Sequence, residues 1–92
     1  MWREDYEELE KRVASRDRAA FSALERAYTN IVNTFIVTKL GDQRAARTLT
    51  ERTFTRAWDV IDRYPWRDFS FHVWILRIAR DEVDNSRGPR EN

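Results

Sequence analysis

Three residues of the types that carry out hydrolysis lie close together in this chain of 92 residues. Asp68, Ser70 and His72 match the components of a hydrolytic triad, and His72 is the single histidine. Because they are two residues apart around a predicted helix start, their side chains diverge and cannot act together as orienting acid, nucleophile and base. We therefore expect no catalytic residue at this place.

The sequence also has few residues that could bind a metal or a cofactor. The chain has no cysteine, and one histidine is too few for a multi-histidine metal site. Glu7–Glu8 and Asp81–Glu82 are adjacent acids that diverge on a helix, so we interpret both pairs as solvated faces. The two glycines, Gly41 and Gly88, lie too far apart to form a phosphate-binding loop. The sequence predicts a binding protein that is not an enzyme and has no metal and no cofactor.

The chemistry that remains is the binding of phosphates and flat rings. Arginine supplies 15 of the 17 basic residues, although codon composition explains this bias at least as well. The formal net charge is only +1, so any contact with nucleic acid must be local. The segment Arg63–Phe71 combines arginines with aromatic rings, which is the combination that single-stranded nucleic acid requires.

Helices must position these residues. Apolar residues recur at steps of three and four over Asp17–Gly41, where Asp17 is a predicted N-cap and Gly41 a predicted helix end. A second pattern starts at Asp42, and we expect that helix to continue until Pro65 stops it. Another helix begins at Ser70, and a shorter acid-rich one begins near Asp5 and breaks around Ser15.

These patterns predict an all-α fold, a compact bundle of three to four helices. We assign residues 1–87 to one helical domain and residues 88–92 to the start of a linker or a disordered tail. Phe71 and Trp74 are expected to fill the core. The longest apolar run, Val73–Leu76, is too short to span a bilayer, so we expect a cytoplasmic protein without a membrane partner.

A series of short motifs occurs along the predicted helices in a fixed order. They are Ala19-Ala20-Phe21, Tyr28, Gly41-Asp42, Leu49 with Phe54, Ala57-Trp58, Phe71 with Trp74-Ile75, and Ile78-Ala79-Arg80. In this order and at these separations they resemble region 2 of the extracytoplasmic-function (ECF) bacterial sigma factors, of the sigma-70 family. The resemblance covers residues 17–87, which is most of the chain.

The resemblance implies a helical domain that binds core RNA polymerase and opens promoter DNA at the minus-ten element without a cofactor. It implies that the outer face of the helix after Asp42 docks on the coiled coil of the polymerase's largest subunit. On this sequence the face comprises Thr48, Leu49, Glu51, Arg52 and Arg56. We expect Leu49 to be exposed as a small apolar anchor within a polar rim, the alternative being that Leu49 belongs to the core.

The resemblance also implies that the loop before Ser70 and the helix after it hold a base flipped from the non-template strand of the minus-ten element. The candidates for this DNA-binding surface are Arg63, Trp66, Arg67, Phe69, Arg77, Arg80, Asp81 and Asn85. Within this set, Trp66, Arg67 and Phe69 are candidates for the pocket wall, and the arginines of the following helix are candidates for phosphate contacts. The alternative for Trp66 is that it packs over the end of the bundle.

Four positions depart from the family pattern. Thr48, Glu51 and Arg52 stand where the family has aspartate, glutamine and glutamate, and Asp81 stands where it has asparagine. These changes alter the charge of the docking face and place an anion where DNA would lie. A second function therefore stays open: a diverged sigma-like domain that binds a regulatory protein, such as an anti-sigma factor, and does not open DNA.

Two further alternatives concern the origin of the chain. An unrelated helical scaffold can mimic the apolar spacing of the family. The helix-turn-helix domain that reads the minus-thirty-five element in the family does not follow within these residues. The sequence alone is therefore compatible with a fragment of a longer sigma factor and with a natural stand-alone domain.

Overall fold

The structure, a computed structural model, describes the backbone of residues 3–87 and the side chains of residues 7–87. Over that range the chain forms four α-helices, one short 3-10 helix and no strand. The elements are α1 (Arg3–Ala14), α2 (Arg18–Leu40), α3 (Gln43–Asp59), η1 (Ile61–Arg63) and α4 (Phe71–Ser86). The predicted all-α bundle is confirmed. The predicted tail, residues 88–92, lies outside the described residues.

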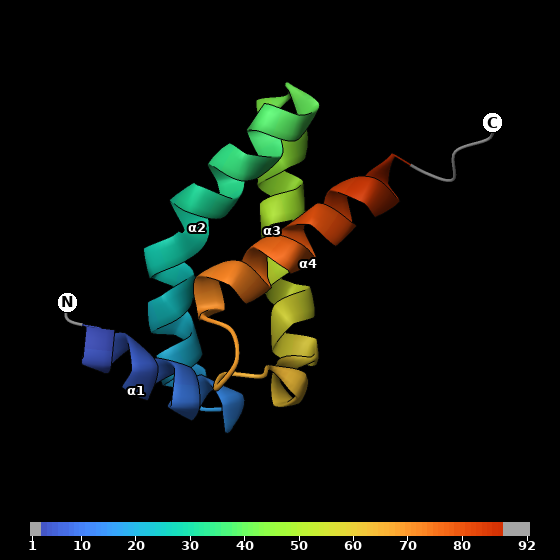
Figure 1. Ribbon diagram of the computed structural model, residues 1–92. Helices are drawn as coiled ribbons and strands as arrows, with labels where there is room; N and C mark the ends of the chain where they lie inside the picture. Colours follow the sequence, from blue (N-terminus) through green and yellow to red (C-terminus); the bar gives the residue numbers. More distant parts are fainter. Residues whose placement is uncertain (1–2, 88–92) are drawn as a thin grey trace.

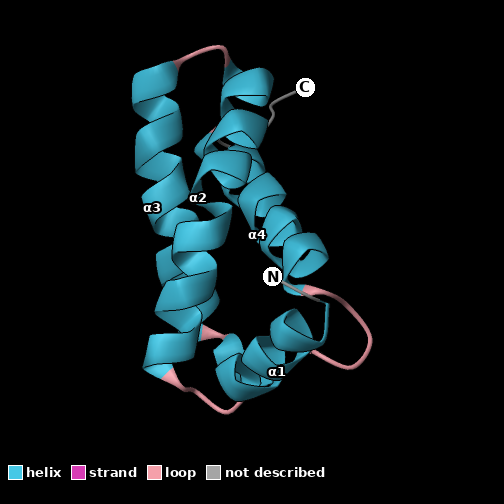
Figure 2. Cartoon of the chain, turned by 90° about the vertical axis from the view of Figure 1, so that its left-hand side faces the viewer, coloured by secondary structure: helices cyan, strands magenta, loops and turns pink. Residues whose placement is uncertain are grey.

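α2 and α3 lie side by side as an antiparallel helical hairpin (Figure 2). Asp17 caps α2 by accepting a hydrogen bond from the amide of Ala20, at 3.0 Å. Gly41 ends α2 in the left-handed conformation, with φ +70°, which glycine adopts without a steric penalty. Asp42 then caps α3 by accepting a hydrogen bond from the amide of Ala45. These boundaries lie where the sequence predicted them.

α3 ends at Asp59, before the predicted stop at Pro65. Val60 leaves the helical conformation, with φ −112° and ψ 21°, and a 3-10 turn follows. Residues three apart in a 3-10 helix point in the same direction. The turn therefore directs both Ile61 and Tyr64 into the core, where they are 0% and 3% exposed. The predicted extension of the helix to Pro65 is therefore wrong. The helix ends six residues before the proline, where the 3-10 turn buries Ile61 and Tyr64.

α4 crosses the hairpin and closes the core (Figure 1). Ser70 caps it by accepting a hydrogen bond from the amide of Val73, at 3.3 Å. Phe71, the first residue of α4, is fully buried, and its ring lies 6.1 Å from that of Phe21 on α2. Phe21 in turn packs edge-on against Phe54 of α3. A cluster of aromatic rings thus joins α2, α3 and α4 at the centre of the bundle.

The core predictions for α4 are met to different degrees. That for Phe71 is confirmed by its complete burial. Trp74 is only half-buried, and its ring lies 4.7 Å from that of Tyr64. Trp74 therefore covers the edge of the core rather than filling it.

α1 lies across one end of the hairpin, beside the loop that precedes α4 (Figures 1 and 2). Val13 is fully buried, and Leu9 packs against the core from one turn earlier. Arg16, in the turn to α2, has φ +65°, a left-handed conformation that is uncommon for a residue other than glycine.

Candidate functional site

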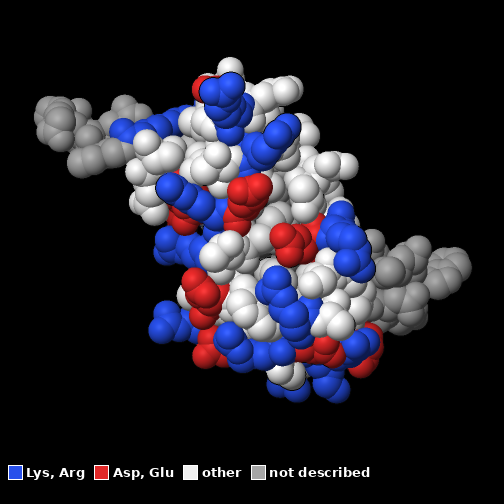
Figure 3. Space-filling model, turned by 180° about the vertical axis from the view of Figure 1, so that it is seen from behind, with Lys and Arg blue, Asp and Glu red and all other residues white. Residues whose placement is uncertain are grey.

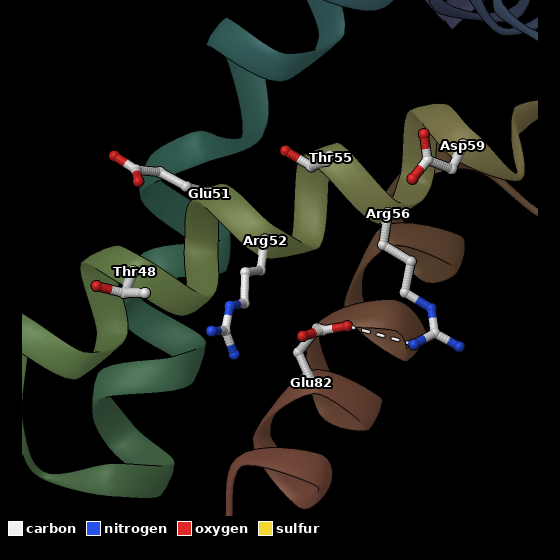
Figure 4. Close-up of a pocket in the computed structure, with 7 residues that line it drawn as sticks. All are labelled: Thr48, Glu51, Arg52, Thr55, Arg56, Asp59 and Glu82. Carbon is white, nitrogen blue, oxygen red and sulfur yellow. Dashed lines mark hydrogen bonds and ion pairs between the residues drawn. The ribbon is translucent and has the colours of Figure 1, made fainter.

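The outer face of α3 lines a shallow groove, and Glu82 of α4 lies at its edge (Figure 4). Four of the five predicted docking residues line it, namely Thr48, Glu51, Arg52 and Arg56. Thr55, Asp59 and Glu82 complete the lining, and the groove encloses about 550 Å³. We call this surface the α3 groove. Its lining contains both cations and anions, so it suits a protein surface of matching charge better than a uniform polyanion.

The mixed charge of the groove is typical of its surroundings. On the back of the molecule, turned by 180° from Figure 1, Lys and Arg side chains lie interspersed with Asp and Glu (Figure 3). The formal net charge of +1 for the whole chain agrees with this distribution. The described part of this face therefore carries no uniformly positive electrostatic potential that would attract nucleic acid nonspecifically.

Within the groove, Arg56 is engaged with a residue of α4. Its Nη1 atom lies 3.4 Å from Oε2 of Glu82. The Glu82 side chain is only 11% exposed, whereas that of Arg56 is 49% exposed. The interpretation of Asp81–Glu82 as a pair of solvated acids is thus wrong for Glu82, which turns inward between α3 and α4. Arg56 consequently stabilises the packing of two helices as well as contributing to the face.

Leu49 does not have the exposure that the docking hypothesis gave it. Only 4% of the residue is exposed, because it lies on the same stripe of α3 as Ala46 and Ala57, which are fully buried. The expectation of an exposed apolar anchor is therefore wrong, and the alternative that Leu49 belongs to the core is confirmed. The docking role predicted for the other four residues stays a prediction.

The segment Tyr64–Ser70, which we call the connector, carries the predicted base-pocket residues. Trp66 is half-buried against the core, as its alternative role required, and the guanidinium of Arg67 lies 4.8 Å from the centre of its ring. Phe69 is 36% exposed, and Arg77 of α4 lies 4.7 Å from the centre of its ring. The structure thus brings the predicted residues together as two arginine–aromatic pairs.

Beyond the connector, the exposed side of α4 continues with further predicted residues. Arg77 and Arg80 border an apolar hollow of about 290 Å³ between α2 and α4. The rest of its lining is Phe35, His72, Val73 and Leu76. Val73 is 42% exposed, so the floor of this hollow is accessible. Two cations therefore flank an accessible apolar surface.

The other predicted DNA-binding residues are less closely grouped. Asp81 and Asn85 are exposed and follow Arg77 by one and two turns of α4, so the three share one ridge. Asp81 thus places an acidic residue one helical turn from an arginine that the DNA hypothesis needs. Arg63 is exposed on η1, at the other end of the connector, and no described contact joins it to the arginine–aromatic pairs.

One buried acid that reaches the connector was not predicted. Glu10 of α1 is 7% exposed, and its Oε2 atom accepts a hydrogen bond from the amide of Phe71 at 2.8 Å. The hydroxyl of Tyr64 donates to the carbonyl oxygen of Phe69 at 3.1 Å. Burial, and then the charge of Glu10, raise the pKa of Tyr64 above its ordinary value. The sequence feature that could have indicated the burial of Glu10 is its position three residues before Val13, on an otherwise apolar helix face.

Two of the residues that match a hydrolytic triad have structural contacts. The hydroxyl of Ser70 caps α4, and the ring of His72 lies edge-on to Tyr28 at 5.7 Å. Among the side chains of residues 7–87 there is no group of three or more potential metal ligands. Within the described part of the chain, no helix is both long and apolar enough to cross a membrane.

Comparison with known proteins finds a protein of similar sequence. The ECF RNA polymerase sigma factor BldN of Streptomyces coelicolor is 32% identical to this chain over 76 residues. The similar region is 83% of this chain but 29% of the relative, so the chain spans less than a third of that protein's length. No family model matches the chain, and no solved structure matches it significantly. The similarity supports a distant relation to the sigma-70 family.

Proposed function

We propose that this chain is a sigma region 2 domain, which binds core RNA polymerase through the α3 groove and single-stranded minus-ten DNA through the connector and α4. The observation that carries the proposal is the grouping of the candidate residues. Four of the five docking residues line one groove, and most of the DNA set lies around two arginine–aromatic pairs on the connector and α4. The similarity to BldN supports the same assignment.

The α3 groove is suited to a helical partner because it is shallow and is lined by charged and threonine side chains. Thr48 and Arg52 lie one turn apart on α3, and Arg52 and Arg56 point toward α4, which carries Glu82 (Figure 4). A helix of the polymerase coiled coil that binds in the groove would contact both basic and acidic side chains at fixed positions. Such a pattern fixes the register of a complex more than it raises its affinity.

Calorimetric titration of the full chain with the coiled-coil fragment of the polymerase's largest subunit tests the docking proposal. Thr48→Trp places a large ring in the groove and should abolish saturable binding. Thr38→Trp is the matched control, because Thr38 is exposed on α2 outside the groove, and it should bind like the wild type. A folded wild-type chain that gives no binding heat would contradict the proposal.

The DNA surface is proposed on the physical needs of a flipped base. Unstacking one base costs a few kcal/mol, and stacking on a protein ring together with phosphate contacts can offset that cost without ATP. Phe69 offers an exposed ring, and Arg77 and Arg80 offer cations on the adjoining helix. The two functions thus occupy different surfaces and can be tested separately.

Fluorescence anisotropy with a labelled pool of random single-stranded DNA, about 12 nucleotides long, tests the DNA proposal. The wild type should bind this pool more tightly than the same pool annealed to its complement. Arg77→Ala should weaken binding to the single strands. Arg26→Ala, at an exposed position of α2 that does not line the hollow beside Arg77, should leave it unchanged. Equal affinity of the wild type for both pools would contradict the proposal.

The second candidate function is a diverged sigma-like domain that binds a regulatory protein and does not open DNA. The observation that favours it is the chemistry of the departures, since Arg52 lines the groove and Asp81 stands beside Arg77. The reversions Arg52→Glu and Asp81→Asn separate the candidates. If this is a weakened sigma surface, they should strengthen coiled-coil and DNA binding respectively. No gain from either would favour the regulatory-protein candidate.

A further inference from the structure

α1 contributes a buried carboxylate to a contact far away in the chain. Glu10 lies on the face of α1 that covers the end of the bundle, and it is 7% exposed. Its Oε2 atom accepts the amide hydrogen of Phe71, 61 residues later, at 2.8 Å. A buried carboxylate is costly unless it is hydrogen-bonded, so this bond helps to make the position tolerable for an acid.

The donor in this bond is the first amide of α4. The first amides of a helix have no partner within it, and together they form the positive end of the helix dipole. Ser70 already accepts a hydrogen bond from Val73 and so provides the local cap of α4. The bond from Glu10 is an additional one, and it ties α4 and the end of the connector to α1.

The connector is also held at its other end. Tyr64 is buried, and its hydroxyl donates to the carbonyl oxygen of Phe69. The amides of Asp68 and Phe69 both donate to the carbonyl oxygen of Pro65, at 2.9 and 3.0 Å. The connector is therefore a closed loop whose last residues sit between Tyr64 and Glu10.

We infer that Glu10 is a positioning residue for the connector, so that α1 contributes to nucleic-acid recognition without touching the nucleic acid. By fixing the amide of Phe71, Glu10 fixes the place at which the loop with Trp66 and Phe69 joins α4. A loop held in its binding conformation loses less conformational freedom when a ligand binds, which raises affinity. The link to recognition rests on the proposed function, whereas the effect on the connector does not.

Two variants of Glu10 separate this role from simple stabilisation. Glu10→Leu keeps the bulk of the buried side chain but removes the acceptor. Glu10→Gln keeps an oxygen acceptor for the Phe71 amide and removes only the charge. Val13→Ala is the matched control, because Val13 is a fully buried residue of the same helix that reaches the connector through no described hydrogen bond.

Amide hydrogen exchange, read residue by residue by NMR, measures the effect on the connector directly. In Glu10→Leu the amides of Asp68, Phe69 and Phe71 should exchange about tenfold faster, while that of Val32 in the core of α2 stays unchanged. Affinity for the random single-stranded DNA pool should fall by about three- to tenfold. Glu10→Gln should restore both values to within about twofold of the wild type. Val13→Ala should lower the thermal midpoint and leave both values unchanged.

Two results would overturn the inference. One is connector exchange in Glu10→Leu that equals that of the wild type. The other is a Val13→Ala protein that loosens the connector and weakens DNA binding as much as Glu10→Leu does. A wild type that binds no DNA, with the connector still loosened selectively in Glu10→Leu, would keep the positioning role and reject the proposed function.

Discussion

Arg56 of α3 and Glu82 of α4 form an ion pair, with 3.4 Å between Nη1 and Oε2, that joins the α3 groove to the helix carrying Arg77 and Arg80. The carboxylate is nearly buried, whereas half of the arginine side chain faces solvent. The groove proposed for polymerase and the helix proposed for DNA therefore share an internal contact. A change of Arg56 affects both the face and its support.

Replacing Arg56 should destabilise the fold more than replacing its neighbour on the same face. Arg56→Ala leaves the Glu82 carboxylate without its ion-pair partner, and we expect a loss of about 1 kcal/mol in the free energy of unfolding. Arg52→Ala, at an exposed position of the same groove, should change it by less than about 0.5 kcal/mol. Urea unfolding followed by circular dichroism measures both. Equal values for the two variants would show that the ion pair adds nothing.

Truncation of Leu49 should act on stability first. Because the side chain is almost fully buried, Leu49→Ala should cost about 2 to 5 kcal/mol through lost contacts and a cavity. Thr48→Ala, at the exposed neighbouring position, should cost less than about 0.5 kcal/mol. Urea midpoints of the two variants provide the measurement. A Leu49→Ala protein with the stability of Thr48→Ala would place Leu49 on the surface after all.

The helix starts could be predicted because local chemistry sets them. Asp17, Asp42 and Ser70 accept hydrogen bonds from amides three residues ahead, and Gly41 takes a left-handed conformation. Each of these signals lies within one turn of the boundary that it marks. The resemblance to sigma region 2 also predicted a docking set and a DNA-binding set, and most members of each set lie close together in the fold. The functions of both sets stay predictions.

Contacts between distant segments could not be predicted in the same way. The partner of Glu10 lies 61 residues away, and that of Glu82 lies on another helix. Both acids stand on helix faces that turn inward only once the bundle is assembled. The exposure of Leu49 was misjudged because the resemblance placed the residue on the docking face, whereas its spacing fits the apolar stripe of α3, where the structure has it.

Tyr64 should make the fold sensitive to alkaline pH. Its pKa is raised in the folded state by burial and then by Glu10, so the folded chain keeps a proton that the unfolded chain releases near pH 10.0. The contribution to stability is full below that pH and is lost progressively as the pH rises above it.

Comparison of the wild type with Tyr64→Phe isolates this effect. The variant lacks the ionisable hydroxyl and should lose about 1 kcal/mol at neutral pH with the hydrogen bond to Phe69. Its stability should then fall less steeply than that of the wild type above about pH 10. Urea midpoints over this range provide the measurement, and the lysines titrate equally in both proteins. Parallel pH curves would exclude Tyr64 as the cause.

Arg80 should contribute to DNA binding as a charge. If it contacts a phosphate of the single strand, Arg80→Ala should reduce the slope of log affinity against log salt concentration by about 0.7. Arg47→Ala removes an exposed arginine of α3, away from the connector and the α3 groove, and should leave the slope unchanged. Anisotropy titrations at several salt concentrations measure both. The same slope in the wild type and in Arg80→Ala would remove Arg80 from the interface.

Trp66 should contribute to DNA binding as a ring. If a base stacks on it, Trp66→Ala should weaken binding to the single-stranded pool by about 1 to 3 kcal/mol, and Trp66→Phe should restore part of the loss. Trp58 is a matched control, because it is also half-buried and lies under two arginines, Arg16 and Arg18, at 4.9 and 4.8 Å. Trp58→Ala removes a similar arginine–aromatic cluster on a different surface and should leave affinity unchanged. Equal losses in the two alanine variants would mean that the connector has no special part in binding, since a tryptophan far from it would then matter as much.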